Sequence, residues 1–162
     1  MRNVICNTSP LQYLHQSGHL QLLPTLYEQI VVPQAVVLEL AAGRELGVDL
    51  PDPSGLPWAI TRQVREPRLL PLATDLGQGE REVLGLGAEM PGALLILDDR
   101  LARQHAALLE LAFTGTLGVL LKAKQEGYLK ALTPVLTQLD ALRFRLSPET
   151  REEVLKLAGE NA

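Results

Sequence analysis

The sequence predicts an α/β fold in which a parallel sheet is sandwiched between helical layers. Short apolar runs that are typical of strands alternate with stretches whose apolar residues recur at helical spacing. One run, at 93–97, is apolar throughout, as expected for a strand that is covered on both faces. Strands that alternate with helices favour a parallel sheet, because parallel neighbours need crossover connections.

Length and composition favour one globular domain over residues 1–162. The chain has 162 residues, of which 46% are hydrophobic, enough for one substantial core. No apolar run approaches the roughly 20 residues needed to span a bilayer, and the first residues lead directly into a strand pattern without a signal-peptide cleavage site. We therefore expect a cytoplasmic protein with no membrane partner. The single cysteine, Cys6, lies in the first apolar run and is expected to be a buried thiol.

The first half of the chain is predicted to contain three strands and three helical stretches. The strands are expected at 3–6, 30–32 and 58–64. The first helix is expected to be capped by Ser9, with Pro10 at its first position, and to end at Gly18. A short helical stretch follows at 19–27, and Pro33 opens the next helix.

The second half is predicted to contain two strands and five helices, the last two of which are C-terminal. A helix is expected after Gly79, followed by the strand at 93–97, a helix at 100–109 and a strand at 111–113. Gly115 precedes the next helix. Thr133 and Ser147 each precede a proline, and both are expected to be hydroxyl caps of C-terminal helices.

Four polar residues far apart in the sequence are expected at one edge of the sheet. They are Asn7, Glu39, Glu80 and Asp98, each of which lies just beyond a predicted strand or near the start of a helix. In open α/β sheets the ligand site lies beyond the carboxyl ends of the strands. Oxygen donors gathered there suit Mg²⁺ or Mn²⁺. The pattern therefore indicates metal-assisted phosphodiester chemistry, with the three acids as ligands and Asn7 as an assisting residue.

Each of these residues also has a structural interpretation. Asp98 ends a buried strand, but it could instead cap the following helix, and Asp99 is its rival for either role. Glu80 shares the apolar face of its helix, whereas Glu82 points away, yet an acid in the first turn also favours the helix dipole. Glu39 could be an exposed polar residue of an amphipathic helix.

Hydroxyl side chains near the same edge are candidates for positioning water or a phosphate oxygen. They are Thr8, Ser9, Thr114 and Thr116, all of which could instead serve in turns or caps. The glycines at Gly77 and Gly79 form too short a pattern for a nucleotide fingerprint, so no nucleotide cofactor is expected. The three histidines have no spacing that suggests zinc. Nine of the fifteen basic residues follow position 99; most are expected to solvate helices, although a few could form a groove.

The chain resembles the PIN-domain proteins, specifically the small prokaryotic branch related to VapC-type toxins. The resemblance covers nearly the whole chain and is specific through its ordered combination of motifs. The motifs are VICNTSPL at 4–11, VPQAVVLEL at 32–40, GERE at 79–82, LILDDR at 95–100, TGTLGVL at 114–120, FRLS at 144–147 and AGE at 158–160.

The resemblance implies a three-layer α/β/α domain with a central parallel sheet and extra C-terminal helices. It further implies a ribonuclease with a Mg²⁺ or Mn²⁺ site in which Glu39, Glu80 and Asp98 fill acidic positions. Asn7 occupies the first position, where the general PIN pattern has Asp. A cognate antitoxin protein and a homodimer are implied as partners, with RNA as the substrate.

Two functional hypotheses follow from the sequence. The first is a metal-dependent endoribonuclease, the toxin half of a type II toxin–antitoxin pair. The alternative is a catalytically weakened module that binds RNA or a protein partner without turnover, because its first acid is replaced by Asn7. A phosphoacceptor domain using Asp98 is a weaker third reading, because no lysine near a late strand end clearly supports it.

Overall fold

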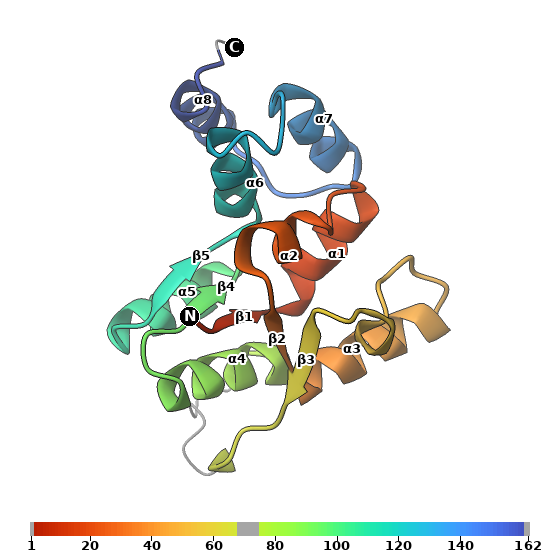
Figure 1. The fold of residues 1–162 in the computed structure, drawn as a ribbon, viewed down its shortest axis with the longest axis vertical. Helices are drawn as coiled ribbons and strands as arrows, with labels where there is room; N and C mark the ends of the chain where they lie inside the picture. The colour runs from red at the N-terminus through yellow and green to blue at the C-terminus, as the bar shows by residue number, and fades with distance from the viewer. Residues whose placement is uncertain (1, 68–74, 161–162) are drawn as a thin grey trace.

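Five parallel strands form the central sheet of this protein, in the order β3-β2-β1-β4-β5 (Figure 1). The computed structural model describes residues 2–67 and 75–160. The strands are β1 (Val4–Cys6), β2 (Ile30–Pro33), β3 (Ala59–Arg62), β4 (Leu94–Ile96) and β5 (Ala112–Thr114). All four pairings between neighbouring strands are parallel, which confirms the sheet type predicted from the alternation of strands and helices.

Helices cover both faces of the sheet and make the three-layer α/β/α arrangement. The helices of the sheet region are α1 (Thr8–Gln16), α2 (Leu22–Tyr27), α3 (Gln34–Glu45), α4 (Gln78–Glu89), α5 (Arg100–Leu108) and α6 (Thr116–Gln125), and a short 3₁₀ turn, η1, covers Pro53–Gly55. Helices α4 and α5 pack together on one face, and α1, α2 and α6 pack together on the other. Helix α3 lies beside β2 and β3, in contact with both α1 and α4.

The core explains why the apolar runs became strands. Ile5, Val32 and Leu95 are fully buried, because the central strands are covered by helices on both faces. The edge strand β3 is different, since its last two residues are exposed. Cys6 is fully buried, as predicted, and burial together with the nearby Asp98 raises the pKa of its thiol. No helix in the described part of the chain is long and apolar enough to cross a membrane.

The start of helix α1 differs from the sequence prediction, whereas the predicted start of the last helix is confirmed. Helix α1 begins at Thr8 with Asn7 at the cap position, so the prediction of a Ser9 cap with Pro10 at the first position is wrong. Pro10 fits the third position because the first four N–H groups of a helix have no partner within the helix. The cap predicted at Ser147 is confirmed, since its hydroxyl accepts a hydrogen bond from the N–H of Thr150.

The C-terminal region adds helices α7 (Thr133–Ala141) and α8 (Pro148–Leu157), which lie beyond α6 from the sheet (Figure 1). Thr133 does not cap α7, contrary to prediction. The carboxylate of Glu160, after α8, instead accepts hydrogen bonds from the N–H groups of Leu132 and Thr133 and from the Thr133 hydroxyl. Lys124 of α6 forms an ion pair with the same carboxylate at 2.9 Å. Glu160 therefore joins α6, α7 and α8.

The pKa of Glu160 is lowered to about 2, chiefly by the hydrogen bond from the Leu132 N–H, with further help from Lys124 and Thr133. A lowered pKa means that the ionised carboxylate stabilises the fold above pH 4.5 and that this stabilisation is lost as the pH falls towards 2. We expect Glu160→Gln to lower the free energy of unfolding by about 1–2 kcal/mol at pH 7. The difference from wild type should shrink in acid.

Denaturant unfolding at pH 7 and at several acidic pH values tests the role of Glu160. Glu153→Gln is the matched control, because Glu153 lies exposed on α8. This control should change the free energy of unfolding by less than about 0.5 kcal/mol. Equal effects of the two substitutions at pH 7 would contradict the proposed role of Glu160.

Candidate active site

The register of the sheet brings distant residues together at its carboxyl edge. Cys6 pairs with Ile96, and Ile96 pairs with Thr114, so β1, β4 and β5 end side by side. The backbone N–H of Asn7 donates to the carbonyl of Ile96 at 3.1 Å, which continues the pairing to the edge. The residues that follow these three strands therefore enter one region, as the rule for open α/β sheets predicts.

Asp98 is held at this edge by donors from two other segments. Its Oδ1 accepts a hydrogen bond from the N–H of Thr116 at 2.8 Å, at the start of α6. Its Oδ2 accepts one from the Thr116 hydroxyl at 2.6 Å and a longer one, at 3.3 Å, from the Ser9 hydroxyl. These donors fix the orientation of an acid that is only partly buried.

Glu39 is fixed in a similar way on the other side of α1. Its carboxylate accepts hydrogen bonds from the Thr8 hydroxyl and, at 3.1 Å, from the backbone N–H of Gly79. Thr8 and Ser9 are adjacent in the sequence, so one turn of α1 contacts Glu39 and Asp98 at once. Glu39 is exposed, and it is not one of the residues that line the cleft described below.

Glu80, in the first turn of α4, has a pKa raised above its ordinary value. Burial is the largest cause, and the negative charges of Glu39 and Asp99 add to it. Its own backbone N–H and the Asn7 side chain act in the opposite direction. A cation bound beside Glu80 would favour its ionised carboxylate.

Glycines make room for each of the three carboxylates. A Cβ atom placed on Gly115 would lie 2.8 Å from Oδ1 of Asp98, and one on Gly79 would lie 2.7 Å from Oε1 of Glu39. A Cβ atom on Gly77 would lie 2.7 Å from Oε2 of Glu80. Such distances are too short for any side chain, so glycine is required for the carboxylates to keep these places. The absence of side chains at Gly77 and Gly79 thus leaves room for the carboxylates of Glu80 and Glu39.

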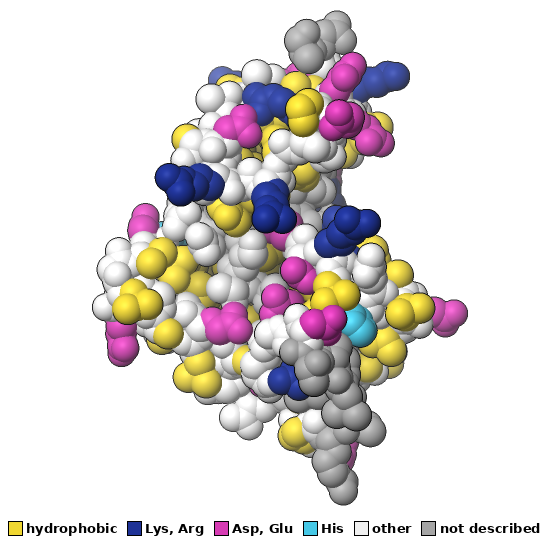
Figure 2. Space-filling model, turned by 180° about the vertical axis from the view of Figure 1, so that it is seen from behind, with side chains coloured by type: hydrophobic (Ala, Val, Ile, Leu, Met, Phe, Trp, Pro, Cys, Tyr) yellow, Lys and Arg dark blue, Asp and Glu magenta, His cyan; other side chains and the backbone are white. Residues whose placement is uncertain are grey.

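A cleft of about 530 Å³ opens at this edge of the sheet. Asn7, Glu80 and Asp98 all line it, together with Ser9 and Asp99. On the face shown in Figure 2, acidic side chains gather near the middle and basic side chains lie beside them. The structure therefore brings three of the four predicted catalytic residues into one cleft and places Glu39 next to it.

Asn7 contributes a buried polar atom without a partner to the cleft. Its side chain is only 3% exposed, and its Oδ1 has no hydrogen-bond partner. A buried amide oxygen without a partner is costly, which favours a ligand or water at this point. Together with the carboxylates of Glu80 and Asp98, it forms the all-oxygen set of donors that hard divalent cations prefer.

The acids do not form a complete metal site by themselves. Within residues 2–67 and 75–160, no three His, Cys, Asp or Glu side chains form a group that could hold a metal ion. Mg²⁺ is commonly bound by only one or two carboxylates and keeps several water molecules. The residues of the cleft thus fit a hydrated cation with Asn7 Oδ1 as an additional donor, whereas the ligand set Glu39, Glu80 and Asp98 remains a prediction.

The structure assigns capping roles to the two rival acids. Oδ2 of Asp99 accepts a hydrogen bond from the N–H of Ala102 at 2.9 Å, so Asp99, rather than Asp98, caps α5. Glu82 accepts a hydrogen bond from the N–H of Ala35 at 2.9 Å, in the first turn of α3. Asp98 is therefore free of the helix cap that was its alternative role.

Three of the four hydroxyls predicted to position water or a phosphate oxygen donate hydrogen bonds to carboxylates, and their positioning role remains a prediction. Thr8 donates to Glu39, whereas Ser9 and Thr116 donate to Asp98. Thr114, at the end of β5, lies against Gly118 and is not among the residues that line the cleft. In this structure Thr8, Ser9 and Thr116 orient acids.

Three arginines and two aromatic residues also line the cleft, and the arginines belong to the group of basic residues for which the sequence left a groove open. Arg103, Arg143 and Arg145 contribute to its wall, as do Tyr13 and Phe144. The signal that could have identified Arg143, Phe144 and Arg145 is the alternation of apolar residues and arginines at 142–146, which helical spacing does not explain.

Comparison with known proteins agrees with this architecture. A family model described as a PIN domain matches residues 3–160, which is nearly the whole chain. A search of curated proteins finds no match. PIN domains have a nuclease-type fold, generally use divalent metal ions and commonly bind RNA. The matched length, the five-stranded parallel sheet and the acids at its carboxyl edge agree, and the chain belongs to the PIN-domain family.

Proposed function

We propose that this protein is a metal-dependent endoribonuclease that acts in the cytoplasm as the toxin component of a type II toxin–antitoxin system. The observation that carries the nuclease proposal is the cleft lined by Glu80, Asp98 and Asn7, in which the side-chain oxygen of Asn7 has no hydrogen-bond partner. The resemblance to VapC-type toxins supports the toxin role and a cognate antitoxin.

The proposed chemistry divides between the cation and the side chains. Glu80 and Asp98, with Asn7 Oδ1 and with Glu39 nearby, would hold Mg²⁺ or Mn²⁺, which lowers the pKa of bound water and neutralises charge on phosphate. Thr116 and Ser9 keep Asp98 oriented through their hydrogen bonds. Thr8 and the Gly79 N–H do the same for Glu39. Oriented donors lose little freedom on binding, which favours a fixed geometry for the phosphate.

A homodimer is also proposed, and the exposed apolar side chains beside the edge strand β5 support it. Leu108 is 81% exposed, and Leu109 and Phe113 also remain accessible. An edge strand with apolar neighbours is a common place for two chains to meet.

One observation favours the alternative function, a module that binds RNA or protein without turnover. Asn7 is neutral, and an amide oxygen attracts a cation less strongly than a carboxylate. A weaker cation site would leave the fold and the cleft intact while slowing hydrolysis.

Titration of the purified protein with Mn²⁺ and Mg²⁺, run alongside cleavage of a mixed RNA pool, tests the proposal. We expect saturable metal binding and cleavage that a chelator abolishes and added Mn²⁺ restores. Metal and RNA binding without cleavage would favour the alternative module. The nuclease proposal would be rejected if the protein showed no metal binding and no cleavage.

A further inference from the structure

The segment between α7 and α8, residues 142–146, presents two arginines to the cleft. Its sequence alternates apolar residues with arginines, Leu-Arg-Phe-Arg-Leu. Phe144 and Leu146 are half-buried against the core, whereas Arg143 and Arg145 are exposed and line the cleft. We call residues 142–146 the arginine segment.

The arginine segment is anchored from beneath by an aromatic contact. The ring of Phe144 lies edge-on to the ring of Tyr13 on α1, with 5.0 Å between the ring centroids and an interplanar angle of 85°. Arg143 adopts a left-handed backbone conformation, with φ of 66°, which is uncommon for a residue other than glycine. The anchor and this unusual conformation fix where the two arginines emerge.

The cleft arginines lack the carboxylate partners that other cations of the protein have. Among the residues that the structure describes, Arg143, Arg145 and Arg103 form no ion pair, although the cleft contains acids. Arg151, on the adjacent helix α8, pairs with Asp140 at 2.6 Å. Arg103 lies over the ring of Phe113, and its buried Nε has no hydrogen-bond partner. Guanidinium groups that have no carboxylate partner in the protein are available to an external anion.

The position of these charges relative to the acids restricts that anion. The whole chain carries a net charge of −4, and the cleft floor is acidic, so a polyanion needs local positive charge to approach. Arginine matches phosphate through its planar fork of N–H donors. An aromatic pair, Tyr13 and Phe144, lines the same cleft, and aromatic side chains contact bases that are not paired in a duplex.

We propose that the arginine segment, together with Arg103, binds the sugar-phosphate backbone of an unpaired RNA strand and positions it over the acids of the cleft. This inference rests on the proposed ribonuclease function and names how its substrate is held. Arg143 and Arg145 take phosphates beside the one at the acids, and Tyr13 and Phe144 present an aromatic edge to a base. The residues are positioning residues, because they bind the strand and do not act on the reacting atoms.

Binding is measured without cleavage, in the presence of a chelator, by fluorescence anisotropy of a labelled 12-nucleotide unpaired RNA at several salt concentrations. The double variant Arg143→Ala/Arg145→Ala should bind at least about tenfold more weakly than wild type. Its salt dependence should fall by about 1.4 in log–log slope, since each lost phosphate contact on a single strand contributes about 0.7. A duplex of the same sequence should bind more weakly to wild type.

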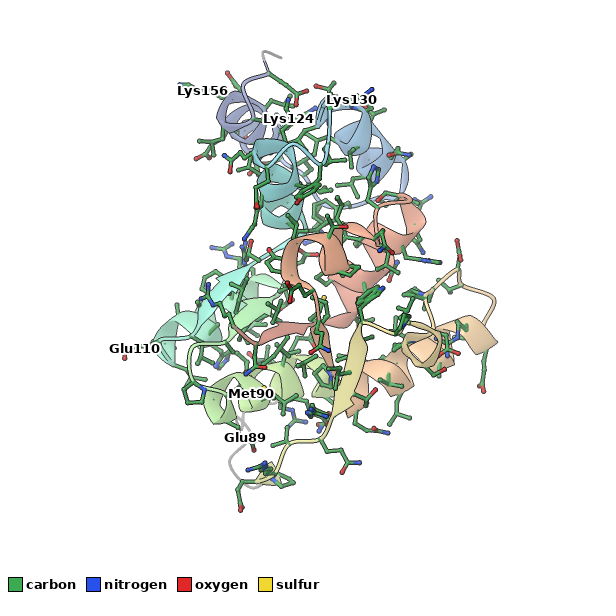
Figure 3. All side chains as sticks on the ribbon, in the orientation of Figure 1. Glu89, Met90, Glu110, Lys124, Lys130 and Lys156 are labelled. Atoms are coloured by element: carbon green, nitrogen blue, oxygen red, sulfur yellow. The ribbon has the colours of Figure 1, made fainter. Side chains whose placement is uncertain are left out.

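A matched control removes two positive charges elsewhere. Lys130 and Lys156 lie at the end of the molecule formed by the C-terminal helices, away from the sheet (Figure 3), and neither lines the cleft. Lys130→Ala/Lys156→Ala should change affinity less than twofold. Arg143→Lys/Arg145→Lys should recover part of the affinity, because lysine keeps the charge but not the fork. Thermal unfolding checks that each variant is folded. If Arg143→Ala/Arg145→Ala does not fold, Arg143→Gln/Arg145→Gln is measured in its place.

The inference would be overturned by equal loss of affinity in Arg143→Ala/Arg145→Ala and in Lys130→Ala/Lys156→Ala, by no RNA binding in wild type, or by competition from polyglutamate as strong as from RNA. Duplex binding as tight as single-strand binding would also overturn it. If wild type cleaves RNA but the arginine variant binds and cleaves equally well, only this inference fails. If wild type binds through these arginines but never cleaves, only the nuclease proposal fails.

Discussion

Asp98→Asn should reduce RNA cleavage by at least about 100-fold and leave the protein folded. The substitution removes the negative charge that three hydrogen bonds orient towards the cleft. Loss of a group that only orients a metal ligand already costs about 10–100-fold, so loss of a ligand's charge should cost more. Cleavage rates of wild type and variant at saturating Mn²⁺ measure the effect.

Folding should tolerate Asp98→Asn because the hydrogen bonds can be kept. The amide oxygen can still accept from the Thr116 N–H, and the amide nitrogen can donate to the hydroxyls of Thr116 and Ser9 after these rotate. Thermal unfolding midpoints of the two proteins should therefore lie close together. An inactive variant that is also unfolded would say nothing about the charge, so the more conservative asparagine is preferred to alanine.

Asp99→Asn is the matched control for Asp98→Asn. Asp99 caps α5, and asparagine caps helices about as well as aspartate. The cleavage rate should change by no more than a few-fold, and the free energy of unfolding by less than about 0.5 kcal/mol. An unchanged rate in Asp98→Asn would reject the assignment of Asp98, and equal losses in both variants would mean that the site does not depend on Asp98 in particular.

The sequence was sufficient to predict the sheet, because its signals are local. The apolar run at 93–97 and the polar residues after it predicted that Asp98 would emerge at a strand end, and β4 places it there. The strand order and register were not predicted, since neither is determined by local spacing. It is the register of Cys6, Ile96 and Thr114 that brings α1 and α6 to the same carboxylate.

The error at Thr133 has a clear physical cause, which is a partner far away in the sequence. Thr133 looked like a helix cap, but Glu160 supplies the acceptors from 27 residues away. The sequence correctly gave Gly77 and Gly79 no weight as a nucleotide fingerprint, but it did not predict that Gly79 lies against the carboxylate of Glu39, 40 residues away. A glycine required by the approach of a distant side chain has no signature in its own surroundings along the chain.

Asn7→Asp is the second substitution from which a large effect is expected. A carboxylate in place of the unpartnered amide oxygen should raise the affinity for Mn²⁺ and speed RNA cleavage by about tenfold, the equivalent of about 1.4 kcal/mol. Without metal, the same charge should destabilise the protein, because it adds repulsion next to Glu80, whose pKa is already raised by burial and by Glu39. Metal titration, cleavage rates and thermal unfolding with and without Mn²⁺ measure these three effects.

The loss of stability expected for metal-free Asn7→Asp should depend on pH. A carboxyl whose pKa is raised in the folded state destabilises the fold when it is ionised, so the penalty grows as the pH rises and is relieved as the pH falls. The metal-free variant should therefore approach wild-type stability in mild acid and fall further below it at neutral pH. Asn3→Asp is the control, because Asn3 is exposed and precedes β1 at the opposite edge of the sheet.

The outcome of Asn7→Asp also decides between the two proposed functions. If wild type binds Mn²⁺ and cleaves RNA, and Asn7→Asp does both better, the protein is a working nuclease in which the Asn7 amide is a tolerated metal ligand. An inert wild type with an active variant makes the natural protein a binding module whose turnover is lost at Asn7. Identical metal affinity in the two proteins would place the cation away from Asn7 and leave its buried oxygen to be satisfied by water.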